Sequence, residues 1–419
     1  MEKYMDRLID QVLRDELEAF GAVYITGPKW CGKTTTGMRL AKSHLFMQDP
    51  DNRQQYLDMA ALQPSRLLDG ENPRLIDEWQ DAPQLWDAIR FEVDRRSAAG
   101  LYILTGSTSV DQRKLAHTGT GRISRVLMRT MSSYESGYSS GEVSLHALFD
   151  GEEISAKSVH TIPDLAEHIV RGGWPGSISK PYAAARRQVA GYCRSILETE
   201  ISLPDEIRRD PEKVAAVLKS YARHIASQAT ITTIVNDVSE YFGPLSRNTA
   251  SDYITALERI YVIEDLKAWS PRLRSKTAIA VSPTRHFVDP AIAAHFLDAG
   301  TDDLMNDLKT YGLLFESLAV RDLRVYAESL DGKVYHYRDH GGLETDAIVH
   351  LPGGRWGAIE VKLGTAWIEE AAANLMKLKD RIDTGRMKAP SFLAVICGKG
   401  YAYKRKDGIY VIPLDCLRN

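Results

Sequence analysis

The stretch GPKWCGKT, residues 27–34, constrains the fold of this 419-residue chain more than any other feature. It fits the pattern G-x-x-x-x-G-K-[ST], follows a short β-type run (AVYIT), and precedes a run with helical spacing that ends near Ser43. Gly27 and Gly32 permit tight turns, so that consecutive backbone N–H groups face a bound phosphate, and the start of the helix favours anions. The stretch therefore predicts a phosphate-binding loop between a strand and a helix.

Within this loop, Lys33 is expected to reach the β- and γ-phosphate oxygens of a nucleotide, and Thr34 is expected to bind Mg²⁺. The remaining positions contribute mainly backbone amides. The predicted nucleotide-binding residues are Gly27, Pro28, Lys29, Trp30, Cys31, Gly32, Lys33, Thr34 and Thr35.

Polar residues at two later strand ends extend this prediction. In LIDEW, Asp77 is expected to hold Mg²⁺ through water and Glu78 to polarise an attacking water, although an acidic helix start has the same appearance. In LYILTGS, either Thr105 or Ser107 is expected to sense the γ-phosphate, and a simple turn role fits equally well. Arg122 is a candidate for contacting the γ-phosphate, in the same chain or across a subunit interface; a plain surface arginine is the alternative.

A second group of charged residues lies in LETDAIVHLPGGRWGAIEVKLG, residues 343–364, which is expected to form two strands joined by a turn. Alternation along a strand places Glu360 and Lys362 on one face, and Asp346 on the neighbouring strand can converge on them. Glu316 precedes them in a predicted helix. The alternative is a hairpin whose charges simply face water.

This pattern of two carboxylates and a lysine is typical of divalent-metal nucleases of the PD-(D/E)XK kind. Asp346 and Glu360 would supply hard oxygen ligands to Mg²⁺, which lowers the pKa of a bound water. Lys362 would orient that water or stabilise the developing negative charge. The expected catalytic residues are Glu78 in the first site and Glu316, Asp346, Glu360 and Lys362 in the second.

The composition, with 44% hydrophobic and 26% charged residues, is that of an ordinary globular protein. A net charge of −3 gives no overall signal for nucleic-acid binding, so any such binding needs a local basic patch. The sequence has no long apolar run and no N-terminal apolar segment, and its four cysteines lack metal-ligand spacing. We therefore expect a cytoplasmic protein with reduced thiols and no membrane contact.

The order of the patterns predicts an α/β protein of three parts. Strands alternate with helices in residues 1–155, which implies a parallel sheet; residues 156–304 are mainly helical; residues 305–419 form a separate α/β unit. The Ser- and Gly-rich segment 131–160 suggests a linker or long loop. RGGWPG, residues 171–176, is expected to be a structural turn with a buried tryptophan.

GPKWCGKTT, LIDEWQ, LTGSTS, the later GR of GTGRIS and RGGWPG occur in an order that resembles bacterial and archaeal AAA+-type ATPases. In that family a winged-helix-like segment and a restriction-endonuclease-like domain follow the ATPase domain. The resemblance covers nearly the whole chain, but only its P-loop is specific. Where the family usually has arginine or glutamine after Gly-Pro, this chain has Lys29 or Trp30, a harmless change because backbone amides bind the phosphates.

Resemblance to a winged helix implies DNA contact through the helix around Ser246–Arg259 and through a basic ribbon. Asp252 and Glu258 on that helix weaken a base-reading role, and winged helices also serve as protein-interaction modules. The ribbon would carry Arg272, Arg274, Lys276 and Arg285.

Together these features predict a protein that binds and hydrolyses ATP with Mg²⁺ and that carries a Mg²⁺-dependent DNA nuclease gated by ATP. Two alternatives remain open: an ATP-driven regulatory switch, and a DNA-repair motor. In both, the nuclease-like domain only binds DNA or a protein partner. The expected partners are ATP and DNA, and a homo-oligomer is compatible with the sequence.

Overall fold

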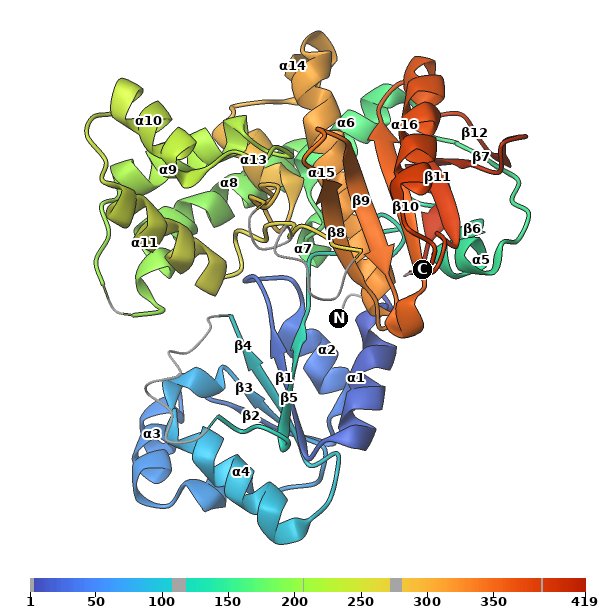
Figure 1. Cartoon of the computed structure of the whole chain (residues 1–419). Coiled ribbons are helices and arrows are strands. Elements are labelled where there is room, and N and C mark those ends of the chain that lie inside the picture. The colour runs from blue at the N-terminus through green and yellow to red at the C-terminus, as the bar shows by residue number, and fades with distance from the viewer. Residues whose placement is uncertain (1–3, 108–117, 206, 272–280, 386) are drawn as a thin grey trace. The chain divides into compact units, whose positions relative to one another are not determined.

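The computed structural model describes residues 4–107, 118–205, 207–271, 281–385 and 387–419 (Figure 1). These residues form two compact units. The first holds the chain up to Thr130 together with Thr199–Arg208 and Ala256–Val262. The second holds Met131–Glu198, Arg209–Thr255 and Ile263–Asn419.

The first unit is built on a five-stranded sheet whose pairings are all parallel, in the order β2-β3-β4-β1-β5. This confirms the parallel α/β sheet that alternating strands and helices predict. The strands are β1 (Ala22–Thr26), β2 (Ser43–Phe46), β3 (Arg74–Asp77), β4 (Tyr102–Gly106) and β5 (Ile123–Leu127). The main helices are α1 (Ile9–Ala19), α2 (Lys33–Leu40), α3 (Arg53–Leu62) and α4 (Gln84–Arg96).

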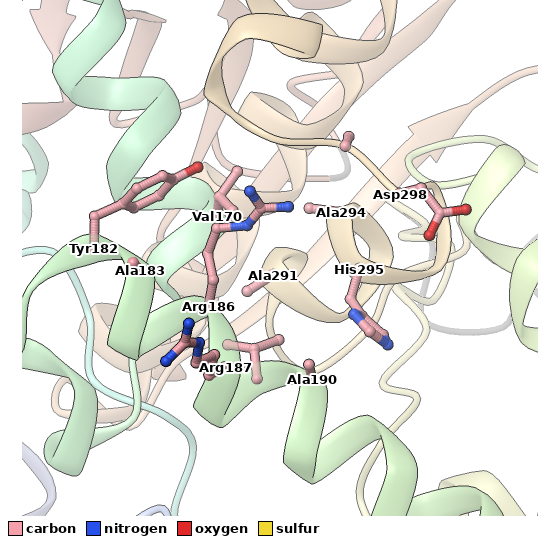
Figure 2. A pocket seen from close by; sticks show the side chains of 12 residues that line it. Val170, Tyr182, Ala183, Arg186, Arg187, Ala190, Ala291, Ala294, His295 and Asp298 are labelled. Atoms are coloured by element: carbon pink, nitrogen blue, oxygen red, sulfur yellow. The ribbon is translucent and has the colours of Figure 1, made fainter.

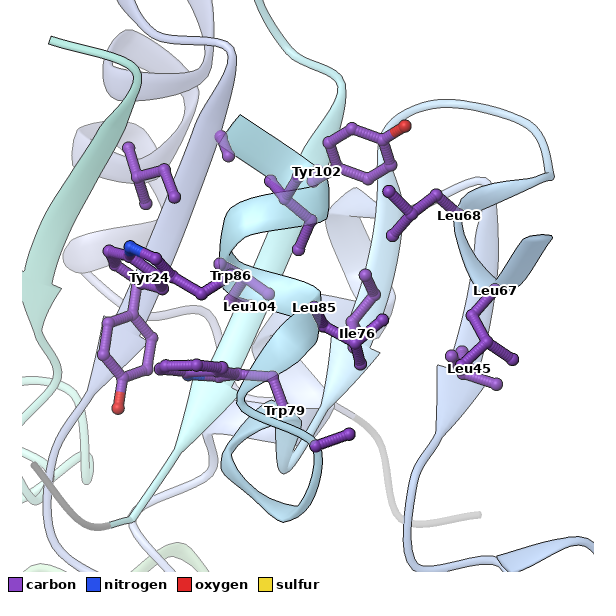
Figure 3. Packing of buried hydrophobic residues seen from close by; sticks show 14 of the residues in the cluster. Tyr24, Leu45, Leu67, Leu68, Ile76, Trp79, Leu85, Trp86, Tyr102 and Leu104 are labelled. Carbon is purple, nitrogen blue, oxygen red and sulfur yellow. The ribbon is translucent and has the colours of Figure 1, made fainter. Parts of the chain in front are cut away.

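Both faces of this sheet are covered by apolar side chains. On one face, Leu13 and Leu17 of α1 join Val23, Ile25 and Ile103 in a buried cluster. On the other, the residues of the strands pack against Trp79, against α3 and against α4, which carries Trp86 (Figure 3). Burial on both faces explains why β1 and β4 are uninterrupted apolar runs rather than alternating ones.

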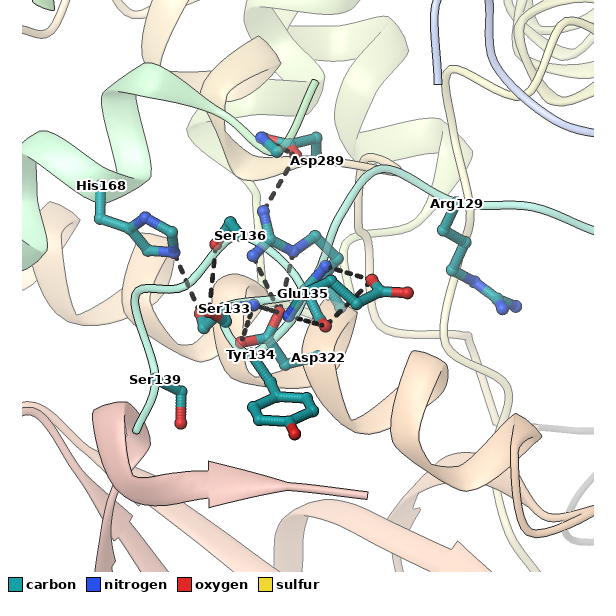
Figure 4. A network of polar contacts seen from close by, with 12 residues as sticks. Arg129, Ser133, Tyr134, Glu135, Ser136, Ser139, His168, Asp289 and Asp322 are labelled. Carbon is teal, nitrogen blue, oxygen red and sulfur yellow. Dashed lines mark hydrogen bonds and ion pairs between the residues drawn. The ribbon is translucent and has the colours of Figure 1, made fainter. Parts of the chain in front are cut away.

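The second unit begins with the Ser- and Gly-rich segment whose composition predicts a linker or long loop, and the first part of this segment is a loop that is packed into the unit. Ser132, Ser133 and Ser139 are buried. The Ser133 hydroxyl lies 3.0 Å from Nε2 of His168. The backbone N–H of Ser133 donates to Asp322, and Asp322 also accepts from the buried Arg321 (Figure 4). Serine composition alone does not separate exposed loops from loops whose hydroxyls are satisfied by a buried network.

The helical part of the second unit follows. Trp174 in RGGWPG is buried, as predicted, at the start of α7. The helices up to residue 306 are α5 (Leu145–Asp150), α6 (Ile162–Arg171), α7 (Pro175–Ile178), α8 (Tyr182–Glu198), α9 (Pro211–Arg223), α10 (Ile231–Tyr241), α11 (Arg247–Arg259, which ends in the first unit), α13 (Pro290–Phe296) and α14 (Thr301–Asn306).

Residues 263–266 and 284–287 lie antiparallel, and Ile263 bridges Phe287 while Leu266 bridges Thr284. Arg285 of the expected basic ribbon is buried and ion-paired with Asp265, so its charge is directed inward. The other three basic residues predicted there, Arg272, Arg274 and Lys276, lie outside the described residues.

The C-terminal part is a seven-stranded mixed sheet in the order β7-β12-β13-β11-β10-β9-β8, with the helices α15 (Leu308–Glu328) and α16 (Ile368–Arg381). Strands β9 and β10 are antiparallel, whereas β10 and β11 are parallel. The strands are β7 (Ala156–Lys157), β8 (Lys333–Arg338), β9 (Glu344–His350), β10 (Trp356–Lys362), β11 (Phe392–Cys397), β12 (Tyr401–Lys404) and β13 (Tyr410–Pro413); β6 (Val143–Ser144) pairs separately with β14 (Leu417–Arg418).

Candidate functional site

The predicted phosphate-binding loop connects the end of β1 to the start of α2. Gly27 and Gly32 have positive φ angles of 144° and 105°. A Cβ atom on Gly27 would lie 2.1 Å from the backbone oxygen of Met128, so no side chain fits there. The loop thus has the backbone shape that lets amide groups surround a phosphate, and this geometry fits the triphosphate of a nucleotide.

The side chains of the loop point in different directions. Lys33 is buried, and its ammonium donates to the backbone oxygens of Gly27 (3.0 Å) and Pro28 (2.9 Å). Cys31 is buried with its thiol against Met128, whereas Trp30 is 56% exposed. Thr35 lies in the first turn of α2. Lys33 therefore holds its charge inside the loop, and its acceptors among the described residues are neutral.

Asp77 joins two hydroxyl groups from neighbouring elements. At the end of β3, its Oδ1 atom accepts a hydrogen bond from Thr34 (2.7 Å) and one from Thr105 at the end of β4 (2.5 Å). Thr34 and Asp77, the residues predicted to hold Mg²⁺, are therefore in direct contact. Their oxygen atoms are the type of ligand that Mg²⁺ prefers.

Glu78 lies beside this cluster in a left-handed backbone conformation, with φ 52°. Its N–H donates to Thr105, and Gln80 donates to its carboxylate. Burial raises the pKa of Glu78, while the bond from Gln80 and the positive charges of Lys33 and Lys29 counteract that shift. A carboxylate with raised proton affinity at this position can orient a water molecule and accept a proton from it.

The two remaining predicted phosphate contacts lie in different places. Ser107 is buried just beyond β4, at the carboxyl ends of the strands, where the loop also lies. Arg122 immediately precedes β5, whose first residue pairs with Ala22 at the start of β1. Arg122 therefore lies at the N-terminal ends of the strands, away from the loop, and it binds Asp94 at 2.8 Å. The structure does not bring Arg122 to the loop within one chain. Its contact across a subunit interface stays a prediction.

One further contact of the loop is not indicated by any sequence pattern. Glu200, in a short 3₁₀ helix (Glu200–Ser202), binds the ammonium of Lys29 at 2.6 Å. Glu200 is only 4% exposed. Since it lies 171 positions after Lys29 and belongs to no recognisable motif, only the folded structure could reveal it.

The charged residues of the second unit converge as the strand pattern predicts. Ala347 in β9 pairs with Ile359 in β10, and this register places Asp346 beside Glu360. The Lys362 ammonium lies 2.8 Å from Glu360 and 3.2 Å from Asp346.

Electrostatics in this group differ from those of ordinary surface charges. Burial, and then the charge of Asp346, raise the pKa of Glu360 to about 8. Burial and Asp346 likewise hold the pKa of Glu316 in α15 well above its usual range. Burial alone would lower the pKa of Lys362, but the charges of Asp346 and Glu360 outweigh it and raise that pKa. Asn374 of α16, which the sequence did not single out, donates to Glu360 at 2.8 Å.

The fit of this group to a metal ion is partial. Asp346 and Glu360 offer carboxylate oxygens that suit Mg²⁺, but Lys362 binds both. Across the described parts of the chain, no group of three or more His, Cys, Asp or Glu side chains is arranged to hold a metal ion. Metal binding here therefore requires Lys362 to give up at least one of its two carboxylate contacts.

The second unit also contains a hollow of about 490 Å³ between α8 and α13 (Figure 2). Arg186, Arg187 and His295 line it beside several alanines, and it contains none of the residues predicted from the sequence. In the described ranges, no helix is both long and apolar enough to cross a membrane.

Three family models match separate stretches of the chain. Residues 19–136 match the model of the AAA domain family, and residues 162–303 and 311–417 match two domains of unknown function, DUF8612 and DUF4143. The chain is 24% identical to the uncharacterized proteins Mb2031c of Mycobacterium bovis and Rv2008c of Mycobacterium tuberculosis, over 96% of its own length and 82% of theirs.

Two solved structures are similar to this chain at low identity and low TM-score. The Walker-type ATPase PABY2304 of Pyrococcus abyssi is 12% identical, with a TM-score of 0.44 over 70% of this chain and 96% of that one. The signal transduction ATPase PH0952 of Pyrococcus horikoshii, which has a tetratricopeptide repeat sensor, is 13% identical, with a TM-score of 0.22 over 78% and 48%. From the loop geometry and the family model, the N-terminal part of this chain is an ATPase-like P-loop domain similar to the AAA domain family.

Proposed function

We propose that this protein binds ATP and hydrolyses it with Mg²⁺ at the loop of the first unit. The main support is the hydrogen bonding of Asp77 to Thr34 and Thr105 beside the loop. Glu78 lies next to them and donates its backbone N–H to Thr105. Bound Mg²⁺ would neutralise phosphate charge, and Thr34 and Asp77 are the residues that would hold it.

The residues of the site have distinct tasks in this proposal. The loop amides and Lys33 bind and orient the phosphates. Glu78 orients the attacking water and accepts its proton, a role for which a raised pKa is suited. Thr105, which binds both Asp77 and the backbone of Glu78, fixes these two carboxylates relative to each other.

The test compares two variants of the full chain by nucleotide binding and by phosphate release. Lys33→Ala is expected to lose both, whereas Glu78→Gln is expected to bind ATP and to lose turnover by at least about a hundredfold. Lys42→Ala, at an exposed position, serves as the control. ATP turnover that survives in Lys33→Ala would contradict the proposal.

A specific observation favours a second activity. The convergence of Asp346, Glu360 and Lys362 on paired strands supports a Mg²⁺-dependent nuclease, in which Lys362 releases a carboxylate when the metal binds. The proposal includes gating of this activity by ATP. Plasmid and single-stranded DNA are incubated with Mg²⁺ or Mn²⁺, with and without ATP. Cleavage that disappears in Asp346→Ala and Lys362→Ala supports the nuclease.

Absence of cleavage together with intact ATP turnover would instead favour the regulatory switch. ATP turnover that DNA stimulates without any cutting would favour the motor. The three-part division at residues 155 and 304, a winged-helix role for α9 to α11, and DNA as the partner belong to this proposal. So does a cytoplasmic location, with which the free cysteines Cys31, Cys193, Cys397 and Cys416 are compatible.

A further inference from the structure

The contact between Lys29 and Glu200 lies on the phosphate-binding loop itself. Lys29 is the third residue of the loop motif, and its side chain is 41% exposed, whereas that of Glu200 is 6% exposed. Lysine carries a compact charge on a flexible stem, so the Lys29 ammonium can move between acceptors. Glu200 is fixed by its burial, and a buried carboxylate is stable as an ion only with close partners.

The charge of Lys29 acts on Glu78, the predicted catalytic carboxylate of the first site. Lys29 and Lys33 both act on Glu78, where they oppose the rise of its pKa. Lys33 is held by backbone oxygens, but Lys29 is held by the full negative charge of Glu200. A nucleotide that approaches this loop therefore meets one lysine bound by neutral groups and one bound by an anion.

Glu200 reaches the loop on a segment with an unusual path. Residues 199–208 belong to the first unit, although the chain on both sides of them belongs to the second. Residues 256–262 also belong to the first unit while their neighbours in sequence belong to the second. Arg259 of this segment lies 3.7 Å from Asp205 in residues 199–208. The acceptor of Lys29 is thus carried by a segment whose two ends are covalently joined to the second unit.

We propose that Glu200 is a positioning residue that competes with the γ-phosphate of a bound nucleotide for Lys29. A nucleoside triphosphate then draws Lys29 away from Glu200 and loosens the segment around it, whereas a diphosphate leaves the ion pair in place. A ligand shifts such an equilibrium only through different affinities for its two states, and the γ-phosphate supplies that difference. The inference rests on the proposed ATP binding and adds to it a means of distinguishing ATP from ADP.

Affinities for Mg²⁺-ATPγS and Mg²⁺-ADP, measured by calorimetry on the full chain, test this competition. Glu200→Gln removes a negative charge near the γ-phosphate and is expected to tighten ATPγS binding about tenfold, with ADP affinity changed less than about twofold. Lys29→Met is expected to weaken ATPγS binding about tenfold and to leave ADP binding nearly unchanged. Glu198→Gln, an exposed neighbour, controls for a general charge effect and should change neither affinity.

Hydrogen exchange gives a readout that a merely structural role would not move. In the wild-type chain, amides in peptides that cover residues 196–205 should exchange faster with ATPγS than with ADP, and Lys29→Met should abolish that difference. Glu200→Asp keeps the charge and should restore the wild-type ratio of the two affinities.

An unchanged ratio of ATPγS to ADP affinity in both Glu200→Gln and Lys29→Met would overturn the inference. So would equal weakening of both nucleotides by Glu200→Gln. If that variant fails to fold, Lys29→Met decides the question alone, since Lys29 is partly exposed and its replacement is tolerated more easily. A wild-type chain that binds neither nucleotide would overturn the proposed function and this inference with it.

Discussion

The two acidic sites of this protein use similar side chains in different electrostatic settings. In the first unit, Asp77 is held by the neutral hydroxyls of Thr34 and Thr105, and Lys33 is held by backbone oxygens. In the second unit, Lys362 binds Glu360 and Asp346 directly. The first arrangement leaves a cation and a carboxylate ready to act on a ligand, whereas in the second they neutralise each other.

The two sites also differ in how strongly they constrain the backbone. The loop site requires a particular backbone path, because Gly27 has no room for a side chain. The β9–β10 site requires that two strands pair in register and that α15 and α16 pack beside them, but it places no comparable demand on the backbone. Geometry therefore supports ligand binding more strongly in the first unit than in the second.

The first prediction concerns the backbone of the phosphate-binding loop. Gly27→Ala should abolish nucleotide binding and lower the free energy of unfolding by about 3 kcal/mol or more, because strain at a positive φ adds to a collision with Met128. Gly121→Ala also has a positive φ but no atom within 4 Å of the added Cβ, so it should cost only about 1 kcal/mol. Urea denaturation and ATPγS binding measure both variants. Equal effects would show that the loop is no more constrained than an ordinary turn.

A second prediction sets the two lysines against each other. Lys362→Met leaves two carboxylates without their shared cation and should lower the free energy of unfolding by about 3 kcal/mol at pH 8. Lys33→Met removes only bonds to neutral oxygens and should cost about 1 kcal/mol, although it abolishes ATP binding. Chemical denaturation of both variants gives the comparison, and the reverse order of stability would contradict it.

The third prediction concerns pH. Because the folded pKa of Glu360 is raised to about 8, the folded chain keeps a proton that the unfolded chain releases at lower pH. Stability is therefore greatest below the unfolded pKa, falls by roughly 4 kcal/mol as pH rises from about 5 to about 8, and levels off above that range. Unfolding of the wild type and of Glu360→Gln at several pH values checks this. The variant should lose the part of that slope that Glu360 contributes, whereas Glu316, whose pKa is also raised, keeps its own part. An identical slope in both would refute the assignment.

The smallest effect concerns Gln80. Gln80→Leu removes the amide that stabilises the charged form of Glu78, so the pKa of Glu78 should rise further. The acidic limb of the pH–rate profile for ATP hydrolysis should move to higher pH, with a loss of less than about tenfold near neutral pH. Gln48→Leu provides a comparison, because Gln48 binds Asp81 rather than Glu78. A pH–rate profile that is unchanged in Gln80→Leu would show that Glu78 is not the group that accepts the proton.

Local patterns predicted the parts of this fold that depend on neighbours in sequence. The loop, its strand and its helix are contiguous, and strand alternation placed Asp346, Glu360 and Lys362 together. Arg122 depends on which end of β5 lies beside the loop, and Glu200 depends on a contact between distant segments. Neither strand direction nor distant contacts are encoded in a short motif, because they follow from the packing of the whole chain.

The segments 199–208 and 256–262 also bear on how the protein is made. During synthesis the loop emerges early, whereas Glu200 follows only after about half of the chain has been translated. The segment 256–262, whose Arg259 pairs with Asp205, follows later still. Domains generally fold from the N-terminus onward during synthesis. The first unit is an exception in this respect: it reaches its complete form only after residue 262 has left the ribosome, with much of the second unit already exposed.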